Sequence, residues 1–269
     1  MLRVWLALAT TIPALITTAT LVVTSGGAPK SAQTAVTATV PGALNLPELN
    51  LNRGSYSISP TSEPNASVVT TDLATSDLGY RPREEVYLAD PSNYDRRVTV
   101  DSEGNAVNND YIVVLHETVG TAMSAINTFQ THHPNDYDQV SYHALITTDG
   151  TVVYMVPPEQ RAFGAGNSVF FSSQGEEAVS TNAEFPSSVN NFAYHVSLET
   201  PADGRNNNNA SHSGYTEAQY QSLAWLISRS TIPEERITTH KAVDRSGSRS
   251  DPRSFEPERL VRLLRLYRG

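Results

Sequence analysis

The sequence contains no cysteine among its 269 residues. This absence excludes disulfide bonds, zinc sites built from thiolates and catalysis by a cysteine nucleophile. Any metal ion would have to be bound by histidine and carboxylate side chains. The chain also lacks an excess of basic residues, since 19 Lys and Arg face 28 Asp and Glu and the net charge is −9. Nucleic acid calls for a basic stripe, so we expect no nucleic-acid partner.

The first 27 residues have the features of a secretory signal. A basic start at Met1-Leu2-Arg3 precedes an apolar run over residues 4–23, and small residues end the segment. The run approaches the ~20 residues that a membrane-spanning helix needs, so an uncleaved anchor is the alternative. Threonines in the run and Pro13 favour the signal. We therefore predict a signal peptide or N-terminal anchor over residues 1–27, with residues 4–23 as the only membrane tether. The protein is then exported to the periplasm or cell envelope, or secreted.

Residues 28–80 form a second region, rich in Ala, Thr, Ser, Pro and Asn and poor in charge. Such a composition buries too little apolar surface to offset the entropy lost on ordering. We predict a disordered linker. The alternative is that residues 44–51 pack on the following domain as an extended arm.

Residues 81–269 read as one α/β domain, because alternating β-rich runs and helical periods appear there. Asp149-Gly150 between two β-rich runs indicates a hairpin. Thr216 and Gln219 have the spacing of a capping box at the start of a helix. We expect helices over residues 121–132, 215–230 and 257–266. We expect strands over residues 97–100, 111–115, 140–147, 151–156, 193–198 and 237–240.

Two histidines end apolar runs in this domain. His116 follows residues 111–115, and His240 ends the last predicted strand. Asp251 follows His240 across a loop that contains Gly247, which lets the chain turn back. Two strand-end histidines and a loop carboxylate can meet around one metal ion, and catalytic zinc takes three protein ligands. Spacing alone leaves open that each histidine is structural.

Five motifs occur in a fixed order along the domain. They are VLHET at residues 114–118, SYHALITTDGTV at 141–152, AFGAGNS at 162–168, VSLE at 196–199 and THKAVDRSGSRSDP at 239–252. Together they resemble the zinc-dependent N-acetylmuramoyl-L-alanine amidase family, type 2, which shares its fold with phage-lysozyme amidases and peptidoglycan recognition proteins. The resemblance covers about residues 108–266. It implies an α/β fold with a single mixed β-sheet flanked by helices.

The resemblance implies that His116, His240 and Asp251 bind a Zn2+ cofactor. It implies an enzyme that hydrolyses the amide between the lactyl group of N-acetylmuramic acid and L-alanine of peptidoglycan, by a zinc-activated water. Peptidoglycan or a muropeptide is then the partner, and we expect a monomer. One alternative is a module of the same fold that binds muropeptide without cutting it, although the presence of Asp251 favours catalysis. Another is a zinc amidohydrolase acting on a small amide.

Two residues are expected near the reacting bond. Ser197-Leu198-Glu199 resembles the segment that carries the catalytic glutamate in the cytoplasmic anhydro-muropeptide amidases, so Glu199 is the predicted general base. An edge carboxylate in water is the alternative. Tyr142 falls where the phage-type enzymes carry a catalytic tyrosine, and its hydroxyl could orient the water. The alternative for Tyr142 is an aromatic that packs across strands.

Further residues complete the predicted site. Arg249 falls where the family usually has a lysine, and a cation there stabilises the oxyanion, although its planar head differs from that of lysine. Gly166 and Asn167 are predicted to contact substrate, with a tight turn as the alternative reading. His143 is expected to be structural, and His195 has no motif support.

Overall fold

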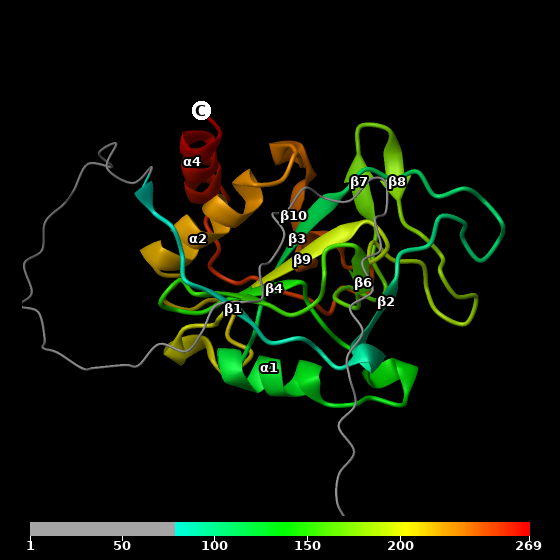
Figure 1. Ribbon diagram of the computed structural model, residues 1–269, viewed down its shortest axis with the longest axis horizontal. Coiled ribbons are helices and arrows are strands. Elements are labelled where there is room, and N and C mark those ends of the chain that lie inside the picture. The colour runs from blue at the N-terminus through cyan, green and yellow to red at the C-terminus, as the bar shows by residue number, and fades with distance from the viewer. Residues whose placement is uncertain (1–78) are drawn as a thin grey trace, which may run out of the picture. The chain divides into compact units, whose positions relative to one another are not determined.

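The structure, a computed structural model, describes residues 79–269 (Figure 1). The predicted signal or anchor over residues 1–27 lies outside the described residues, as does all of the predicted linker except its last two residues. Export, the membrane tether and the linker therefore stay predictions. In the part of the chain that is described, no helix is long and apolar enough to cross a membrane.

A six-stranded mixed sheet forms the centre of the domain, in the order β1, β5, β4, β9, β3, β10. Neighbouring strands run parallel, except that β4 and β5 are antiparallel. This arrangement confirms the predicted α/β class with a mixed sheet. The strands are β1 (Glu84–Val86), β3 (Ile112–Glu117), β4 (Ala144–Ile146), β5 (Val152–Tyr154), β9 (Ala193–Leu198) and β10 (Ile237–Thr239).

Helices cover both faces of this sheet (Figure 1). α2 (Glu217–Ser228) and α4 (Pro257–Arg268) pack on one face, in a buried core that includes Leu115. α1 (Ala122–Gln130) packs on the other face, in a core that includes Leu145. Since successive side chains of a strand point to opposite faces, the central strands contribute to both cores. The predicted helices are confirmed, with shorter bounds for the first two.

Local sequence signals account for the β4–β5 hairpin and for the start of α2. Gly150 has a φ of 87°, and a Cβ there would lie 2.6 Å from Tyr80 Oη and 2.9 Å from the carbonyl oxygen of Ala218. The turn therefore requires glycine. At the start of α2, Thr216 accepts from the backbone N–H of Gln219, whose side chain accepts from the N–H of Thr216. Both predictions are confirmed.

The predicted strand over residues 97–100 is wrong. The strand in this region is β2 (Tyr94–Arg96), which pairs with β6 (Gln160–Ala162). Long-range contacts override the local alternation. The backbone N–H of Val98 donates to the side-chain oxygen of Asn191, whose amide group donates to the carbonyl oxygen of Val98. The backbone there is therefore bonded to a side chain and not to a neighbouring strand. The guanidinium of Arg97 donates to the carbonyl oxygens of Pro158, Asn190, Asn191 and Ala193.

The remaining elements are short. The segment over residues 157–190 contains β6, β7 and β8, of which β7 and β8 form a second hairpin. α3 follows β10 without a gap. Their bounds are β7 (Phe170–Ser172), β8 (Gly175–Glu177) and α3 (His240–Val243), with 3-10 turns at Pro91–Asn93, Asp136–Asp138, Ala202–Gly204 and Glu234–Arg236.

Candidate metal centre

The two candidate histidines lie at the carboxyl edge of the central sheet. β3 ends with His116 and Glu117, and β10 runs parallel to it with Thr239 paired to Leu115. His240 follows Thr239 directly and begins α3. Parallel strands end at the same edge, so this register brings the two imidazole rings to a centroid distance of 4.7 Å.

Asp251 returns to this edge at the end of the loop that follows α3. The backbone N–H of Lys241 donates to the carbonyl oxygen of Asp251 at 2.9 Å, which fixes the end of the loop beside His240. Asp251 Oδ2 lies 3.4 Å from His116 Nδ1, and His240 Nδ1 lies 3.1 Å from both carboxylate oxygens. The structure therefore brings the three predicted ligands together, with one ligand atom of each within 4.8 Å of the others.

This cluster has the properties of a metal site. All three residues are buried. Nδ1 of His116 faces Asp251 without the geometry of a hydrogen bond, so within residues 79–269 this buried nitrogen has no hydrogen-bond partner. A metal ion would supply the missing contact. Two imidazole nitrogens and one carboxylate are a ligand set that catalytic zinc takes, leaving one position open.

The protonation states at neutral pH also suit metal binding. Burial lowers the pKa of His116 to about 4, against the opposite effect of Asp251. Burial alone would raise the pKa of Asp251, but its contacts with His116 and His240 hold that pKa well below the usual range. His116 is therefore neutral and Asp251 ionised, which are the forms that ligate metals.

Comparison with known proteins shows the family of the chain. A sequence model described as N-acetylmuramoyl-L-alanine amidase matches residues 107–254, which is more than half of the chain and includes all three ligands. The chain belongs to this amidase family. No curated protein sequence matches it.

Solved structures of amidases are similar to the chain. A selenomethionine derivative of AmpD has 27% identity over 68% of this chain and 94% of its own, with a TM-score of 0.46. AmpD of Citrobacter freundii has 24% identity over 70% and 90%, with a TM-score of 0.41. AmiD of E. coli, solved with a muramyl-peptide substrate, has 20% identity over 61% and 65%, with a TM-score of 0.43. Because these TM-scores are low, family membership rests on the sequence match.

In this amidase-family chain, Tyr142 lies directly beside the first metal ligand. Its ring stacks on His116 with 4.3 Å between centroids, and it meets Phe129 of α1 edge-on. Burial raises the pKa of Tyr142, so the hydroxyl stays protonated. In the described part of the chain this hydroxyl has no hydrogen-bond partner. The ring therefore packs against its neighbours, as the alternative expected.

Arg249 lies on an exposed loop whose shape is set by Asp244. The carboxylate of Asp244 accepts from the backbone N–H groups of Ser246, Ser248 and Arg249. Among residues 79–269, the guanidinium of Arg249 has no ion pair. Besides burial, which is the largest cause, the charge of Arg249 contributes to the low pKa of His116. The guanidinium is thus within electrostatic reach of the metal centre.

Gly166 and Asn167 border the same loop. The carbonyl oxygen of Asn167 accepts from the N–H of Arg245 at 3.1 Å, and Ser168 forms a β-bridge with Asp244. Both predicted residues are exposed, and a Cβ at Gly166 would meet no atom within 4 Å. Packing therefore does not require glycine at this position. Their contact with substrate stays a prediction.

Glu199 lies at the same edge of the sheet, but its carboxylate serves other partners. Oε1 accepts from the N–H of Ala122, the first residue of α1, and from Arg205, both at 3.0 Å. Oε2 accepts from the N–H of Thr148 at 3.0 Å. Within the described residues, Glu199 makes no hydrogen bond or ion pair with the three ligands. The alternative expectation, a solvent-exposed carboxylate at the edge of the sheet, is wrong, because Glu199 is only 8% exposed. These contacts instead join α1, β9 and the β4–β5 hairpin.

Two residues of β9 lie nearer to the metal ligands than the sequence motifs indicate. The register of β9 against β3 pairs Ser197 with His116, and His195 with Val114. His195 Nδ1 lies 2.9 Å from His116 Nε2. Ser197 Oγ is buried and, among the residues described, has no hydrogen-bond partner. The period-two alternation of a strand is the signal that would have placed His195, Ser197 and Glu199 on one face.

A buried ion pair joins two of the ligand segments on the opposite face of the sheet. Glu117 follows His116, and Arg253 lies two residues after Asp251. Nε of Arg253 donates to Oε1 of Glu117, and these side chains are 3% and 1% exposed. The hydroxyl of Tyr215 donates to the other carboxylate oxygen at 3.0 Å, and the remaining guanidinium nitrogens donate to a neighbouring loop. Such a pair is favourable in the interior only when its remaining groups are hydrogen-bonded, as they are here.

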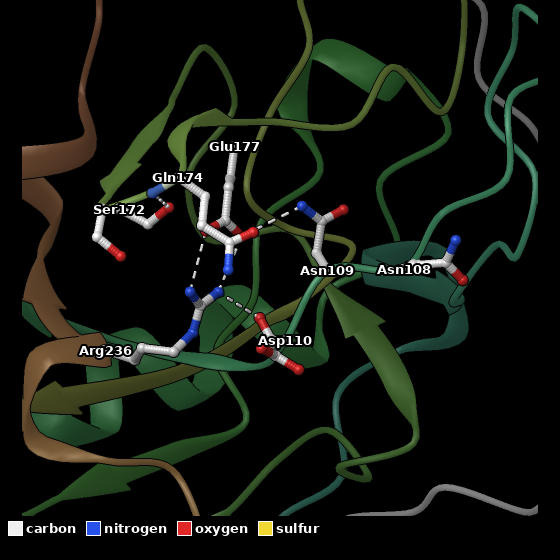
Figure 2. A pocket seen from close by; sticks show the side chains of 8 residues that line it. Asn108, Asn109, Asp110, Ser172, Gln174, Glu177 and Arg236 are labelled. Carbon is white, nitrogen blue, oxygen red and sulfur yellow. Dashed lines mark hydrogen bonds and ion pairs between the residues drawn. The ribbon is translucent and has the colours of Figure 1, made fainter.

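A separate polar hollow of about 270 Å³ lies at the amino edge of the sheet, where β3 and β10 begin (Figure 2). Arg236 crosses it and donates to both carboxylate oxygens of Glu177 and to the carbonyl oxygens of Asp110 and Tyr111. Its donors are therefore directed to protein groups. Because the metal ligands lie at the carboxyl edge, this hollow is not part of the metal centre.

Proposed function

We propose that the protein is a zinc-dependent hydrolase that cleaves the amide between the lactyl group of N-acetylmuramic acid and L-alanine in peptidoglycan. The observation that carries this proposal is the buried cluster of His116, His240 and Asp251, in which Nδ1 of His116 lacks a hydrogen-bond partner among the described residues. Membership of the amidase family supports the substrate class.

The three ligands would hold the ion at the carboxyl edge of the sheet. Zinc bound in such a site acts as a Lewis acid and lowers the pKa of a coordinated water towards about 7. Neutral His116 offers the lone pair of Nδ1, and ionised Asp251 offers a negative charge that offsets part of the charge of the cation. Burial keeps these three groups away from competing solvent.

We propose that Tyr142 and Arg249 act on the substrate. The protonated hydroxyl of Tyr142 can donate a hydrogen bond beside the metal centre and so orient the reacting oxygen. The free guanidinium of Arg249 stabilises the negative charge that develops on the carbonyl oxygen during attack. Because the carboxylate of Glu199 is held by three structural donors, we assign the orienting role to Tyr142 and a positioning role to Glu199.

The outer parts of the site would contact the glycan-peptide strand. Gly166 and Asn167 lie beside Arg245 in the loop between His240 and Asp251 and are exposed, so both are proposed to contact the substrate. We further propose that the protein acts as a monomer on peptidoglycan or its muropeptide fragments, in the cell envelope where the polymer lies. Light scattering coupled to size-exclusion chromatography checks the oligomeric state.

Digestion of purified sacculi tests the proposal. Zinc-loaded protein is expected to release stem peptides that carry new L-alanine amino termini, and a chelator is expected to stop the release. The variant Asp251→Ala should lose zinc, measured by elemental analysis after dialysis. Full zinc occupancy in that variant would show that another residue is the third ligand.

The same assay separates the proposal from its rivals. Zinc-loaded protein that sediments with sacculi but frees no stem peptide is a binding module of the amidase fold. Cleavage of small amides without release of stem peptides would identify a different amidohydrolase.

A further inference from the structure

We propose that His195 is a positioning residue that fixes the ring orientation and the metal-binding tautomer of His116. The inference rests on the metal centre of the proposed function and adds a residue to it. His195 belongs to none of the groups assigned so far to the ligands or to the substrate. It is fully buried in the middle of β9, on the face of the strand that carries Ser197.

The contact between the two rings is direct. His195 Nδ1 lies 2.9 Å from Nε2 of His116, which is the ring nitrogen that points away from Asp251. A neutral imidazole carries one N–H, so the partner of one nitrogen decides the state of the other. When His195 accepts the hydrogen bond, His116 carries its proton on Nε2. The lone pair of Nδ1 is then directed at Asp251 and His240, where the ion would bind.

The direction of this contact also decides where the proton of His195 lies. When His195 accepts at Nδ1, its own proton is on Nε2, a buried atom without a hydrogen-bond partner among residues 79–269. In the reverse arrangement His195 donates from Nδ1, and the proton of His116 is on Nδ1, which then has no lone pair for a metal ion. Metal binding at Nδ1 of His116 therefore requires His195 to act as the acceptor.

The surroundings of His195 hold its ring in place. A Cβ on Gly164 would lie 2.5 Å from His195 Nδ1, so the backbone of Gly164 passes directly over the ring. The ring also stacks on His143, with an interplanar angle of 10°. His143 Nδ1 accepts the backbone N–H of His195 at 2.9 Å. A ring fixed in this way can orient His116 but has little freedom of its own.

The residue His143 supplies a matched control. It is as buried as His195, and it bonds to the backbone of His195 and to the carbonyl oxygen of Gln160. Among the described residues it contacts none of the three ligands by a hydrogen bond. Loss of either histidine should destabilise the fold, but loss of His195 should weaken metal binding more, because His143 reaches His116 only through His195.

The experiment measures the zinc dissociation constant by competition with a chelator, together with the unfolding free energy of the metal-free protein. Replacing a partner of a metal-ligating histidine typically weakens metal binding 10- to 100-fold, and we expect about that loss for His195→Leu. His195→Gln carries its amide beyond the position of Nδ1 and should lose a similar factor. His195→Asn places an amide at the position of Nδ1 and should stay within about threefold of the wild type.

Two results would overturn the inference. One is wild-type zinc affinity in folded His195→Leu and His195→Gln. The other is a loss of affinity in His143→Leu, normalised to folded protein, that equals the loss at His195. Absence of zinc binding by the wild-type chain would instead remove the metal centre of the proposed function, and the inference with it.

Discussion

Tyr142 and Glu199 show how much a residue's partners decide what it can do. Glu199 follows β9 at the carboxyl edge of the sheet, whereas Tyr142 precedes β4 and reaches His116 with its ring. The carboxylate of Glu199 accepts three hydrogen bonds from protein donors, whereas the hydroxyl of Tyr142 has none within the described chain. A carboxylate that already accepts hydrogen bonds from three protein donors has little capacity left to bind substrate. The free hydroxyl is thus the better candidate for a part in the reaction.

The variant Tyr142→Phe tests this reading at the residue itself. The ring still stacks on His116, so we expect unchanged zinc content and nearly unchanged stability. Loss of the hydroxyl should reduce turnover of muropeptide on the order of 10²-fold, the lower end of the range for a positioned proton-transfer or orienting group. The measurement is kcat on a defined muropeptide with zinc content determined on the same sample. Wild-type turnover with full zinc would leave the ring as a packing aromatic only.

Arg249 gives a second prediction at this scale. Its guanidinium is exposed and unpaired among the residues described, so Arg249→Ala should leave the unfolding free energy within about 0.5 kcal/mol of the wild type. If the charge stabilises the oxyanion, turnover should fall about 10²- to 10³-fold. Arg249→Lys should recover part of the loss, because the charge remains while the planar head is gone. Equal turnover of the alanine and lysine variants would contradict a role for the charge.

At the scale of elements, Glu199 joins three of them. Its carboxylate binds the first N–H of α1, the N–H of Thr148 in the β4–β5 turn, and the side chain of Arg205. An acidic group at a helix N-terminus is favourable because the orphan N–H groups there carry partial positive charge. The side chain of Glu199 therefore connects α1, the β4–β5 turn and Arg205 at this edge of the sheet.

We expect Glu199→Gln to act on stability more than on zinc. One backbone N–H then faces an amide NH2 group and stays unsatisfied, which should lower the unfolding free energy by about 1–3 kcal/mol. Zinc affinity should change little, since Glu199 makes no hydrogen bond or ion pair with the ligands in the described chain. Denaturant titration and chelator competition measure the two quantities. A large loss of turnover in a stable, zinc-loaded variant would restore Glu199 as the general base.

The elements that local chemistry decides could be predicted from the sequence. The β4–β5 hairpin depends on Gly150, and the start of α2 depends on Thr216 and Gln219, all within a few residues. The predicted strand over residues 97–100 is wrong because the backbone of Val98 bonds to the side chain of Asn191, far along the chain.

In the candidate site, too, the local sequence indicates some residues, and long-range pairing decides the others. The ordered motifs predicted three ligands, and the structure brings these residues together. The neighbours of the ligands depend on the register of β9 against β3, a long-range property. That register places Ser197 beside His116 and leaves Glu199 beyond the end of β9. No local pattern states which residue of one strand lies opposite a given residue of another.

For the whole molecule, the amino edge of the sheet carries an ion pair whose effect depends on pH. Hydrogen bonds from Arg236 hold the pKa of Glu177 at about 2, below its ordinary value of 4.5. A lowered pKa means that the carboxylate stabilises the fold fully above the unfolded value. The contribution is lost as the pH falls from about 4.5 towards about 2.

Glu177→Gln should remove this dependence. The unfolding free energy at neutral pH should fall by up to about 3 kcal/mol, and the difference from the wild type should shrink to a small value near pH 2. Urea titrations at a series of pH values measure it. Glu176→Gln is the control, because Glu176 is its neighbour in sequence and its side chain is 62% exposed. A constant difference between wild type and Glu177→Gln across that pH range would contradict the assignment.

The buried pair of Glu117 and Arg253 has a consequence for exchanging the proposed metal ion. It joins the segments of His116 and Asp251 on the far side of the sheet. The folded chain therefore holds the proposed ligands in position without help from a metal ion. The domain should therefore survive removal of the ion and accept another divalent cation without refolding. Cobalt(II) in place of zinc would then give a coloured protein, whose visible absorption reports the number and symmetry of the ligands.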